Sequence, residues 1–281
     1  MGRIVYAAAM SHVLHPEYYD KNVGPRGRAL VEALIAVVRE MGVDLAARRP
    51  DAIVIVADDH LNVFSFDAVP AMCVRIGRTV RRMVQEDAIE FDKALDGLPD
   101  RYPVHEGLAE RILERGLEAG FDFAASWSGA LDHAFLSPLT TLYGERPIPP
   151  LVPFWVNCFV PPLPRARRCF AAGRHIARVV AESPWDVAVL ATGGLSHFPE
   201  LSLARVGESD VEFDRRVVGW MEAGEHEALQ ALTGKELHAS GSHELLNWMV
   251  LLGAVAPAKA RVRFFGEMGR IDLAALEWAL A

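Results

Sequence analysis

The chain has 281 residues, of which 51% are hydrophobic, so a disordered protein is excluded and the length suffices to bury a full core. Its formal net charge of -8 argues against nucleic acid or an anionic membrane surface as the main partner.

Cysteine usage and hydropathy restrict the compartment in which we expect the protein. The three cysteines are far apart and include no CxxC pair, so neither a disulfide framework nor a structural zinc site is expected. No secretory signal pattern opens the chain, and its longest apolar run, 245–256, is too short to span a bilayer. We therefore expect a soluble cytoplasmic protein with no membrane segment.

The first part of the chain predicts a βαβ unit. Residues 4–10 form a continuous apolar run that is typical of a buried strand, and it ends at Ser11-His12. Apolar residues at three- and four-residue spacing predict a helix over 24–41, stopped by the glycine that follows. A second buried strand, 52–57, ends at Asp58-Asp59-His60. Neighbouring parallel strands would bring the two histidines close together.

The same alternation of helices and strands continues through the middle of the chain. Ser137-Pro138 is expected to end one segment and let a helix begin. The other predicted elements are a helix over 104–119, strands near 121–126 and over 151–159, a helix over 166–181 and a strand over 187–190.

The last part of the chain is predicted to be mostly helical, with helices over 210–221, 243–255 and 271–281. Residues 262–265 are expected to return a last strand to the sheet, and no repeat or linker interrupts the chain. The pattern therefore predicts one α/β domain over 1–281, a single-domain sandwich whose mostly parallel or mixed sheet is flanked by helices.

A histidine also follows the strand over 187–190, in the run Gly193-Gly194-Leu195-Ser196-His197. Ligands of open α/β sheets collect at the carboxyl ends of strands, and two glycines let the backbone approach a ligand closely. His197 is therefore the first candidate for a working residue, although a solvated turn histidine would fit the same pattern.

Several common catalytic motifs are absent from the sequence. His226-Glu227 and His243-Glu244 both lack the second histidine of a zinc protease, and no Walker loop or GxGxxG run is present. No GxSxG elbow surrounds Ser196, so a metal-independent hydrolase built on Ser196 and His197 is only a weak alternative.

What remains is a set of residues at strand exits and at one helix start: His12, His60, Asp132, His133, His197 and Glu244. Two neutral imidazoles and one carboxylate form a facial triad, which suits non-haem Fe(II) because positions stay open for substrate and dioxygen. The alternative is that Glu244 only places a favourable charge at a helix N-terminus.

The motifs, taken together, resemble the class III extradiol ring-cleavage dioxygenases, the family of the protocatechuate 4,5-dioxygenase β subunit. The resemblance is nearest to the 2,3-dihydroxyphenylpropionate 1,2-dioxygenase branch and extends from about Tyr6 to Ala256. It rests on Ser11-His12, Asp59-His60-Leu61-Asn62 with Phe66-Asp67 and Pro70, Asp132-His133-Ala134-Phe135, Gly193-Gly194-Leu195-Ser196-His197, and His243-Glu244 with Trp248.

The resemblance implies an iron cleft at the strand ends of a single α/β sandwich. His12, His60 and Glu244 would ligate Fe(II), and the enzyme would cleave a catechol-type substrate with O2 to a ring-opened semialdehyde acid. His197 would act as the base and His133 as the acid.

The resemblance also carries implications for the surroundings of the site. Asp132 beside His133 and Asp59 beside His60 would orient those rings, and a structural role for Asp59 is an equal alternative. The segment from His197 to Gly241 is expected to help cover the site. The passage 264–281 departs from the family pattern and would serve the pocket wall or an oligomer interface.

Nothing in the chain resembles the small α subunit of two-subunit members, so we expect it to work alone as a homo-oligomer. Two other functions stay open at this point. One is a metal-binding protein of the same fold without ring cleavage, against which intact His133 and His197 argue. The other is the hydrolase built on Ser196 and His197.

Overall fold

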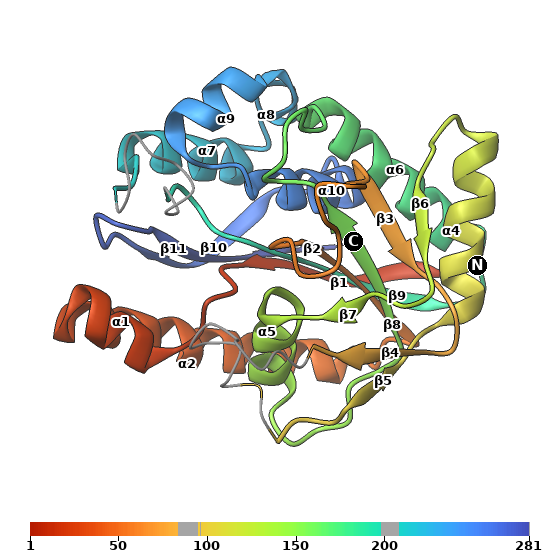
Figure 1. Cartoon of the computed structure of the whole chain (residues 1–281), viewed down its shortest axis with the longest axis horizontal. Coiled ribbons are helices and arrows are strands. Elements are labelled where there is room, and N and C mark those ends of the chain that lie inside the picture. The colour runs from red at the N-terminus through yellow and green to blue at the C-terminus, as the bar shows by residue number, and fades with distance from the viewer. Residues whose placement is uncertain (84–94, 96, 198–207, 281) are drawn as a thin grey trace.

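An eight-stranded mixed sheet, in the order β10-β11-β1-β9-β2-β8-β3-β6, organises the computed structural model, which describes residues 1–83, 95, 97–197 and 208–280 (Figure 1). The strands are β1 (Arg3–Met10), β2 (Ala52–Asp58), β3 (Met72–Arg75), β6 (Ala124–Ser126), β8 (Leu151–Val156), β9 (Asp186–Thr192), β10 (Ala260–Gly266) and β11 (Leu273–Trp278).

The four central strands, β1, β9, β2 and β8, run parallel to one another. All seven residues of β2 and all six of β8 are buried, because helices cover both faces of the sheet. This explains why these strands are continuous apolar runs in the sequence. Antiparallel β11 extends the sheet beyond β1, and β3 pairs antiparallel with β8 at the other side. The predicted α/β class with a mixed sheet is confirmed.

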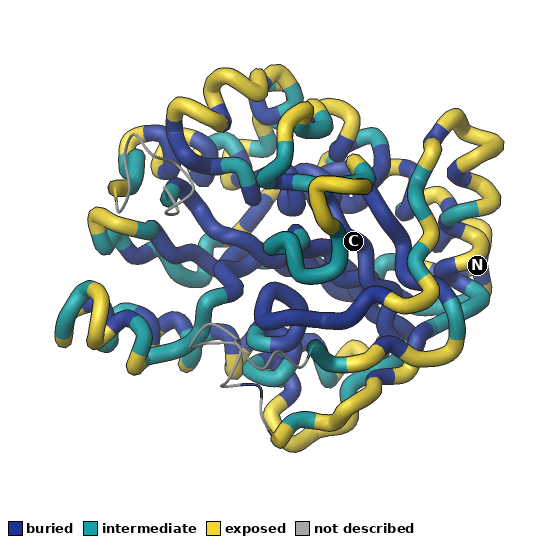
Figure 2. The backbone as a smooth tube through the Cα atoms, in the orientation of Figure 1, coloured by how far each residue is buried: buried dark blue, intermediate teal, exposed yellow. Residues whose placement is uncertain are grey.

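Helices form a layer on each face of the sheet, and the buried strands run between them (Figures 1 and 2). One layer contains α1 (Pro16–Val23), α2 (Pro25–Ala47) and α5 (His133–Tyr143), beside a small sheet of β4 (Thr79–Arg82), β5 (Arg101–Pro103) and β7 (Ala130–Leu131). The other contains α4 (Glu106–Glu118), α6 (Ala166–Ala181), α7 (Val211–Ala223), α8 (His226–Ala231), α9 (Gly234–Ser240) and α10 (Leu245–Val255).

Helix α10 is the most enclosed of the helices that position the site. All eleven of its residues are buried, since it packs against α6 and also contacts β9, β1 and β2. Its N-terminal end, and therefore Glu244, lies over the ends of the parallel strands.

The predicted helix over 271–281 is wrong, because residues 273–278 form strand β11. Alanine, leucine and glutamate favour helices in isolation. Here Ala274 and Leu276 enter the core on one face of the sheet, while Leu273 and Ala275 enter the core on the other. Pairing with β1 and β10 buries both faces at a period of two residues, and this packing outweighs local propensity.

The predicted helix start at Pro138 is also wrong, because Pro138 lies inside α5. Proline has no N–H to donate to the carbonyl four residues earlier, which belongs to Ala134. That carbonyl instead accepts a hydrogen bond of 2.7 Å from the Thr192 hydroxyl at the end of β9. The helix therefore tolerates the proline, and the same hydrogen bond joins α5 to the sheet.

Glycine 42 does not stop α2, which continues to Ala47. A Cβ at Gly42 would lie 1.8 Å from the backbone oxygen of Leu142, so the glycine serves the close packing of α2 on α5. Elements α1, α8, α9, β3, β4, β5 and β7 were not predicted. Within the described part of the chain, no helix combines the length and the apolar character needed to cross a membrane.

The contact at Gly42 gives a stability prediction. Gly42→Ala is expected to lower the free energy of unfolding by about 1–3 kcal/mol, because the new methyl group overlaps the backbone of α5. Gly219→Ala, at an exposed position of helix α7 where a Cβ meets nothing within 4 Å, is the matched control and should raise the free energy of unfolding by about 0.5–1 kcal/mol. Urea denaturation measures both; equal effects would contradict the assignment.

Candidate metal and catalytic site

The exits of β1 and β2 bring two imidazoles together. His12 follows β1 by two residues and His60 follows β2 by two residues, and their ring centroids lie 5.1 Å apart. The two strands are not direct neighbours, since β9 lies between them. The predicted proximity of His12 and His60 is nevertheless found, because all three strands end at the same edge of the sheet.

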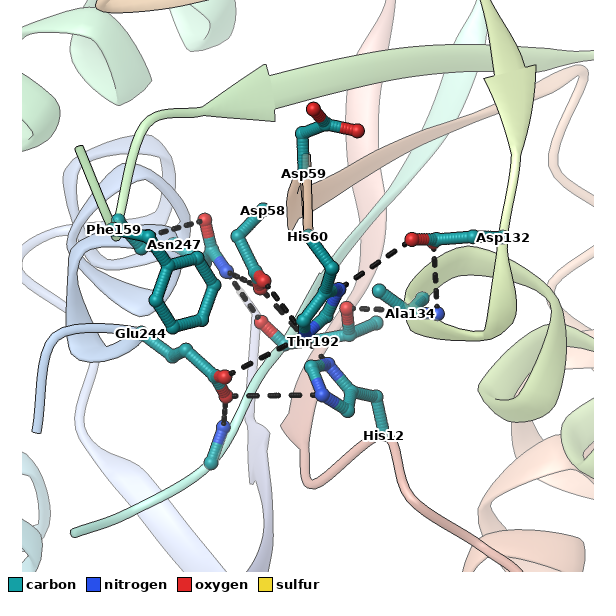
Figure 3. Close-up of polar contacts among 12 residues, drawn as sticks. His12, Asp58, Asp59, His60, Asp132, Ala134, Phe159, Thr192, Glu244 and Asn247 are labelled. Carbon is teal, nitrogen blue, oxygen red and sulfur yellow. Dashed lines mark hydrogen bonds and ion pairs between the residues drawn. The ribbon is translucent and has the colours of Figure 1, made fainter. Parts of the chain in front are cut away.

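Glu244, immediately before α10, faces both imidazoles (Figure 3). Its Oε2 lies 3.9 Å from His12 Nε2, and its Oε1 lies 3.9 Å from His60 Nε2. Donor atoms around one octahedral metal ion, with bonds of about 2.1 Å, lie about 3–4 Å from one another. Each imidazole therefore faces a different oxygen of Glu244, at a spacing found between neighbouring ligands of one ion.

Unsatisfied polar atoms and donor spacing also point to a bound cation at this place, although not to His12, His60 and Glu244 as one set. His12 Nδ1 and Glu244 Oε1 are buried without a hydrogen-bond partner among the described residues. Two sets of side chains can each place three donor atoms within 4.8 Å of one another: His12 with His60 and His133, and His12 with Asp58 and Glu244. The donor set of imidazoles and carboxylates fits a divalent transition metal.

The two glycines after β9 allow the backbone to reach Glu244. The Gly194 N–H donates to Glu244 Oε2 in a short hydrogen bond. Gly193 has φ of 135°, and a Cβ there would lie 3.0 Å from the Cβ of Glu244. The predicted reason for the glycine pair, a close approach of the backbone, is therefore found, although the partner is a side chain of the protein.

His197 and His133 complete a group of four imidazoles around the site. His197 Nε2 lies 3.3 Å from Glu244 Oε1, and its Nδ1 lies 3.1 Å from the Leu195 carbonyl. Because a carbonyl only accepts, Nδ1 is assigned the proton and Nε2 faces the site. His133, the first residue of α5, places its ring 4.6 Å from His60 and 5.2 Å from His12.

The acidic neighbours of His60 differ from those expected. Asp132 Oδ2 faces His60 Nδ1 at 3.4 Å, so Asp132 orients His60 and not the adjacent His133, while its Oδ1 caps α5. The Asp59 carboxylate points away from the imidazoles (Figure 3) and accepts hydrogen bonds of 2.9 Å from the backbone of Val63 and Phe64. Asp59 thus holds the loop that follows β2. This is the structural role that was the alternative to orienting His60.

Sequence reasoning missed three residues of the site. Asp58, the last residue of β2, is fully buried, and its Oδ2 lies 3.2 Å from His60 Nε2. Asn247, one turn after Glu244, donates a hydrogen bond of 2.8 Å to Asp58 Oδ1. The Phe159 ring lies 5.3 Å from His60. The signal for Asp58 was its place at the end of an otherwise apolar buried strand.

Burial and charge set the protonation of the donor groups. Burial and the neighbouring His60 and His133 lower the pKa of His12 to about 3, although Glu244 acts to raise it, so His12 is neutral. Burial raises the pKa of Glu244, but the three surrounding imidazoles lower this pKa by more than burial raises it. Glu244 therefore stays ionised. Burial raises the pKa of Asp58 to about 7.

Two imidazoles carry positive charge when only the protein's own groups are considered. Burial lowers the pKa of His60, but Asp58 and Asp132 raise it to about 10. Burial also lowers the pKa of His197, but Glu244 raises it to about 9. These charges balance the buried carboxylates, as a bound cation would.

The Ser196 side chain is buried against α7 and does not face the imidazoles of the site. It is fully buried, and its hydroxyl donates a hydrogen bond of 2.5 Å to Asp214 Oδ2 in α7 and accepts one from the Asp210 N–H. The Asp214 carboxylate also accepts from the Ser196 N–H, at 3.0 Å. This arrangement does not expose a nucleophile, so it favours a metal-dependent site over the hydrolase.

The fold and the site together define an α/β protein with a candidate metal centre at the ends of its parallel strands. Residues 6–269 match the family described as the catalytic LigB subunit of aromatic ring-opening dioxygenase, and the chain belongs to this family. The resemblance stated from the sequence is thereby confirmed. Residues 198–207, part of the segment expected to cover the site, lie outside the described residues.

Curated relatives carry the name 2,3-dihydroxyphenylpropionate/2,3-dihydroxicinnamic acid 1,2-dioxygenase. One from Pseudomonas putida is 31% identical over 215 residues, which is 76% of this chain and 62% of the relative. One from Escherichia coli O139:H28 is 32% identical over 189 residues, or 67% of this chain and 55% of the relative. The matches thus span less than two thirds of the relatives' length.

A solved structure supports the fold alone. An uncharacterized protein from Escherichia coli K12 is similar with a TM-score of 0.59 and 17% identity, covering 98% of this chain and 100% of that one.

The buried Asp214 gives a prediction for stability against pH. Burial raises the pKa of Asp214 to about 7, well above about 3.9 in the unfolded chain, so the folded state binds more protons between these values. Its contribution to stability therefore falls as pH rises from about 4 through 7. Asp214→Asn, which keeps the size, removes this loss, so the variant should gain relative to wild type between pH 5 and 8.

The measurement is urea denaturation at pH 5, 6, 7 and 8. Glu222→Gln, an exposed carboxylate on the same helix, is the control and should follow the wild-type pH curve. An Asp214→Asn curve parallel to wild type would show that Asp214 is ionised at pH 5 and contradict the prediction.

Proposed function

We propose that this protein is an Fe(II)-dependent extradiol dioxygenase, which opens the aromatic ring of a catechol-type substrate with O2 to give a semialdehyde acid. The observation that carries the proposal is the convergence of His12, His60 and Glu244 beside His133 and His197, in a chain of the ring-opening dioxygenase family. The metal-binding protein without ring cleavage has no need of two further imidazoles at this position.

His12, His60 and Glu244 would hold the iron. Two imidazoles and one carboxylate suit Fe(II) and leave positions for other ligands. Bound iron would relay electron density from the electron-rich ring to dioxygen, which does not react directly with a closed-shell ring. The protein's contribution is to orient the substrate, exclude water and move protons.

His197 would be the general base that takes a proton from a catechol hydroxyl. Its Nδ1–H points to the Leu195 carbonyl, which leaves Nε2 to accept a proton on the side of Glu244. The Glu244 carboxylate is the main group that raises the pKa of His197. A positive charge bound to that carboxylate therefore favours the neutral imidazole that a base requires.

His133 would be the acid that assists ring opening, and Phe159 would pack against the substrate ring. His133 is buried and lies beside both His12 and His60, so a proton on it would stay close to the reacting oxygens. The Phe159 ring lies next to His60, where it offers an aromatic wall.

The proposal also covers the substrate, the compartment and the assembly of the protein. The names of the relatives make 2,3-dihydroxyphenylpropionate the first substrate to test. The three free, buried cysteines are consistent with a reducing cytoplasm. We propose that the chain works without nucleic acid, membrane or a small second subunit, as a homo-oligomer.

The test of the proposed function is anaerobic reconstitution with Fe(II), followed by air and a panel of catechols that includes 2,3-dihydroxyphenylpropionate. We expect a yellow product and one dioxygen consumed per product, read from an oxygen electrode and visible absorbance. Tightly bound iron without dioxygen uptake on any catechol would instead support the metal-binding protein.

Removal of a proposed ligand should abolish metal retention. His12→Ala and Glu244→Ala are expected to lose bound Fe(II) and all ring cleavage, since each takes away one of three ligands. The control is His105→Ala, which removes a partly buried ring contact with Trp185 at the opposite end of β9 and should keep the iron. Metal analysis after gel filtration gives the result. Full iron content and activity in either ligand variant would contradict the assignment.

Removal of the proposed base should separate binding from catalysis. His197→Ala is expected to keep Fe(II) but lose about 10²–10⁴-fold in kcat, the usual contribution of a general base. Iron content and steady-state kinetics on one preparation decide this. Normal turnover would remove His197 from the mechanism.

A further inference from the structure

The loop that carries His197 begins with two glycines, which contribute no side chain to its packing. Gly193 has φ of 135°, a conformation that glycine adopts without strain, and glycine leaves the backbone free to adopt others. A catalytic base must keep its position, because a displacement of about 1 Å can cost about 100-fold in rate. Contacts from outside the glycine pair must therefore fix the backbone next to His197.

Asp214 supplies such contacts to Ser196, the residue before His197. The Ser196 hydroxyl donates to Asp214 Oδ2 at 2.5 Å, and the Ser196 N–H lies 3.0 Å from Oδ1 and 3.1 Å from Oδ2. Asp214 is fully buried on α7, where Phe213 and Val217 enter the core, so the carboxyl group has a firm support. One carboxyl group thus holds both the backbone and the side chain of Ser196.

A further contact of Asp214 reaches the segment that pairs with His197. The His197 N–H donates to the Gly241 carbonyl at 3.2 Å. The hydroxyl of Ser242, the next residue, donates to Asp214 Oδ1 at 3.4 Å. Asp214 therefore holds Ser196 directly and, through Ser242, the segment whose carbonyl accepts from His197.

Asp272, in the turn between β10 and β11, approaches from the other side. Its N–H donates to the Ser196 carbonyl at 3.4 Å, and the preceding Ile271 forms an isolated β-bridge with His197. Its Oδ1 accepts from the backbone of its own turn at 3.1 Å, whereas Oδ2 is buried and has no hydrogen-bond donor among the described residues. The side chain faces the carboxyl group of Asp214.

A proton shared by the two carboxyl groups accounts for this contact. Two carboxyl groups side by side in a buried place do not both ionise, so they keep a proton between them. Burial and the Asp272 carboxyl raise the pKa of Asp214 to about 7, although the hydrogen bonds from Ser196 act to lower it, and burial also raises the pKa of Asp272. The shared proton joins Asp272 to Asp214 and replaces repulsion with a hydrogen bond.

We propose that Asp214 is a positioning residue for the proposed base: with Asp272 it fixes the backbone of Ser196 and His197, so that His197 Nε2 keeps its place beside Glu244. The inference rests on the proposed function for the role of His197 as a base. It also gives the passage 264–281 a part in holding the base, because the turn that contacts the His197 loop belongs to it.

The test compares Asp214→Ala with Asp214→Asn in iron-loaded enzyme on one catechol. Asp214→Ala removes the acceptor of both Ser196 donors and should lower kcat about 10–100-fold, while KM and bound Fe(II) stay within about threefold of wild type. Asp214→Asn keeps an oxygen that can accept from both donors and adds an N–H for Asp272, so its kcat should stay within about threefold of wild type. A merely structural role would not separate kcat from KM and iron content.

The matched control is Glu222→Ala, the same change on an exposed carboxylate of α7, and its kcat should stay within about twofold of wild type. Ser196→Ala guards against a failure of Asp214→Ala to fold. It removes only the hydroxyl bond of 2.5 Å and should lower kcat about three- to tenfold with the iron retained.

Amide hydrogen exchange reports the same contacts without turnover. Mass spectrometry of the peptide that contains Ser196 and His197 should show exchange at least about tenfold faster in Asp214→Ala and unchanged in Asp214→Asn, with the peptide of α10 protected in both.

Three results would overturn this inference while ring cleavage by wild type leaves the proposed function standing. They are wild-type kcat in Asp214→Ala and Ser196→Ala, equal loss of kcat in Asp214→Ala and Asp214→Asn, and unchanged exchange of the Ser196 peptide in Asp214→Ala. Absence of ring cleavage in wild type would instead overturn the proposed function, and with it the base that Asp214 is proposed to position.

Discussion

The buried carboxylate of Glu244 is the group on which the arrangement of the site depends. It is 1% exposed, and its oxygens face the imidazoles of His12, His60 and His197. A charge this deeply buried is tolerated only when it is paired and hydrogen-bonded. The Gly194 N–H and the surrounding imidazoles meet that requirement, so the loop after β9 and the exits of β1 and β2 are tied to one point.

The scaffold brings these groups together through packing far from the reacting atoms. Helix α10 is buried on every side, which fixes Glu244 and Asn247 over the strand ends. The Thr192 hydroxyl joins the end of β9 to the first turn of α5, where His133 lies. Asp214 in α7 holds the Ser196 backbone immediately before His197. The four imidazoles are therefore carried by elements that contribute separately to the core.

Sequence patterns predicted much of the sheet and most of the residues that meet at the candidate site. The central strands were recognisable because burial on both faces makes them continuous apolar runs, and their exits pointed to His12, His60 and His197. Asp58 was missed because Asp59 is the residue next to His60 in the sequence and was taken as its partner. Along extended backbone, successive side chains point to opposite sides, so Asp58 shares a side with His60 and Asp59 faces away. Which carboxylate faces His60 thus depends on the side of the backbone to which each side chain points, and not on its distance from His60 in the sequence.

The C-terminal strand shows the other limit of sequence reasoning. Residues 273–278 have the composition of a helix, and pairing with β1 and β10 makes them a strand. Asp132 likewise pairs with His60, which is distant in sequence, and not with adjacent His133. Contacts of this kind depend on the assembled sheet, so local patterns carry no signal for them.

The most direct test of a metal centre at these strand ends is a crystal structure of protein reconstituted anaerobically with Fe(II), with anomalous scattering measured on both sides of the iron absorption edge. We expect one strong iron peak, within bonding distance of His12 Nε2, His60 Nε2 and a Glu244 oxygen. An iron peak elsewhere, or none at these side chains in protein that carries iron in solution, would contradict this expectation.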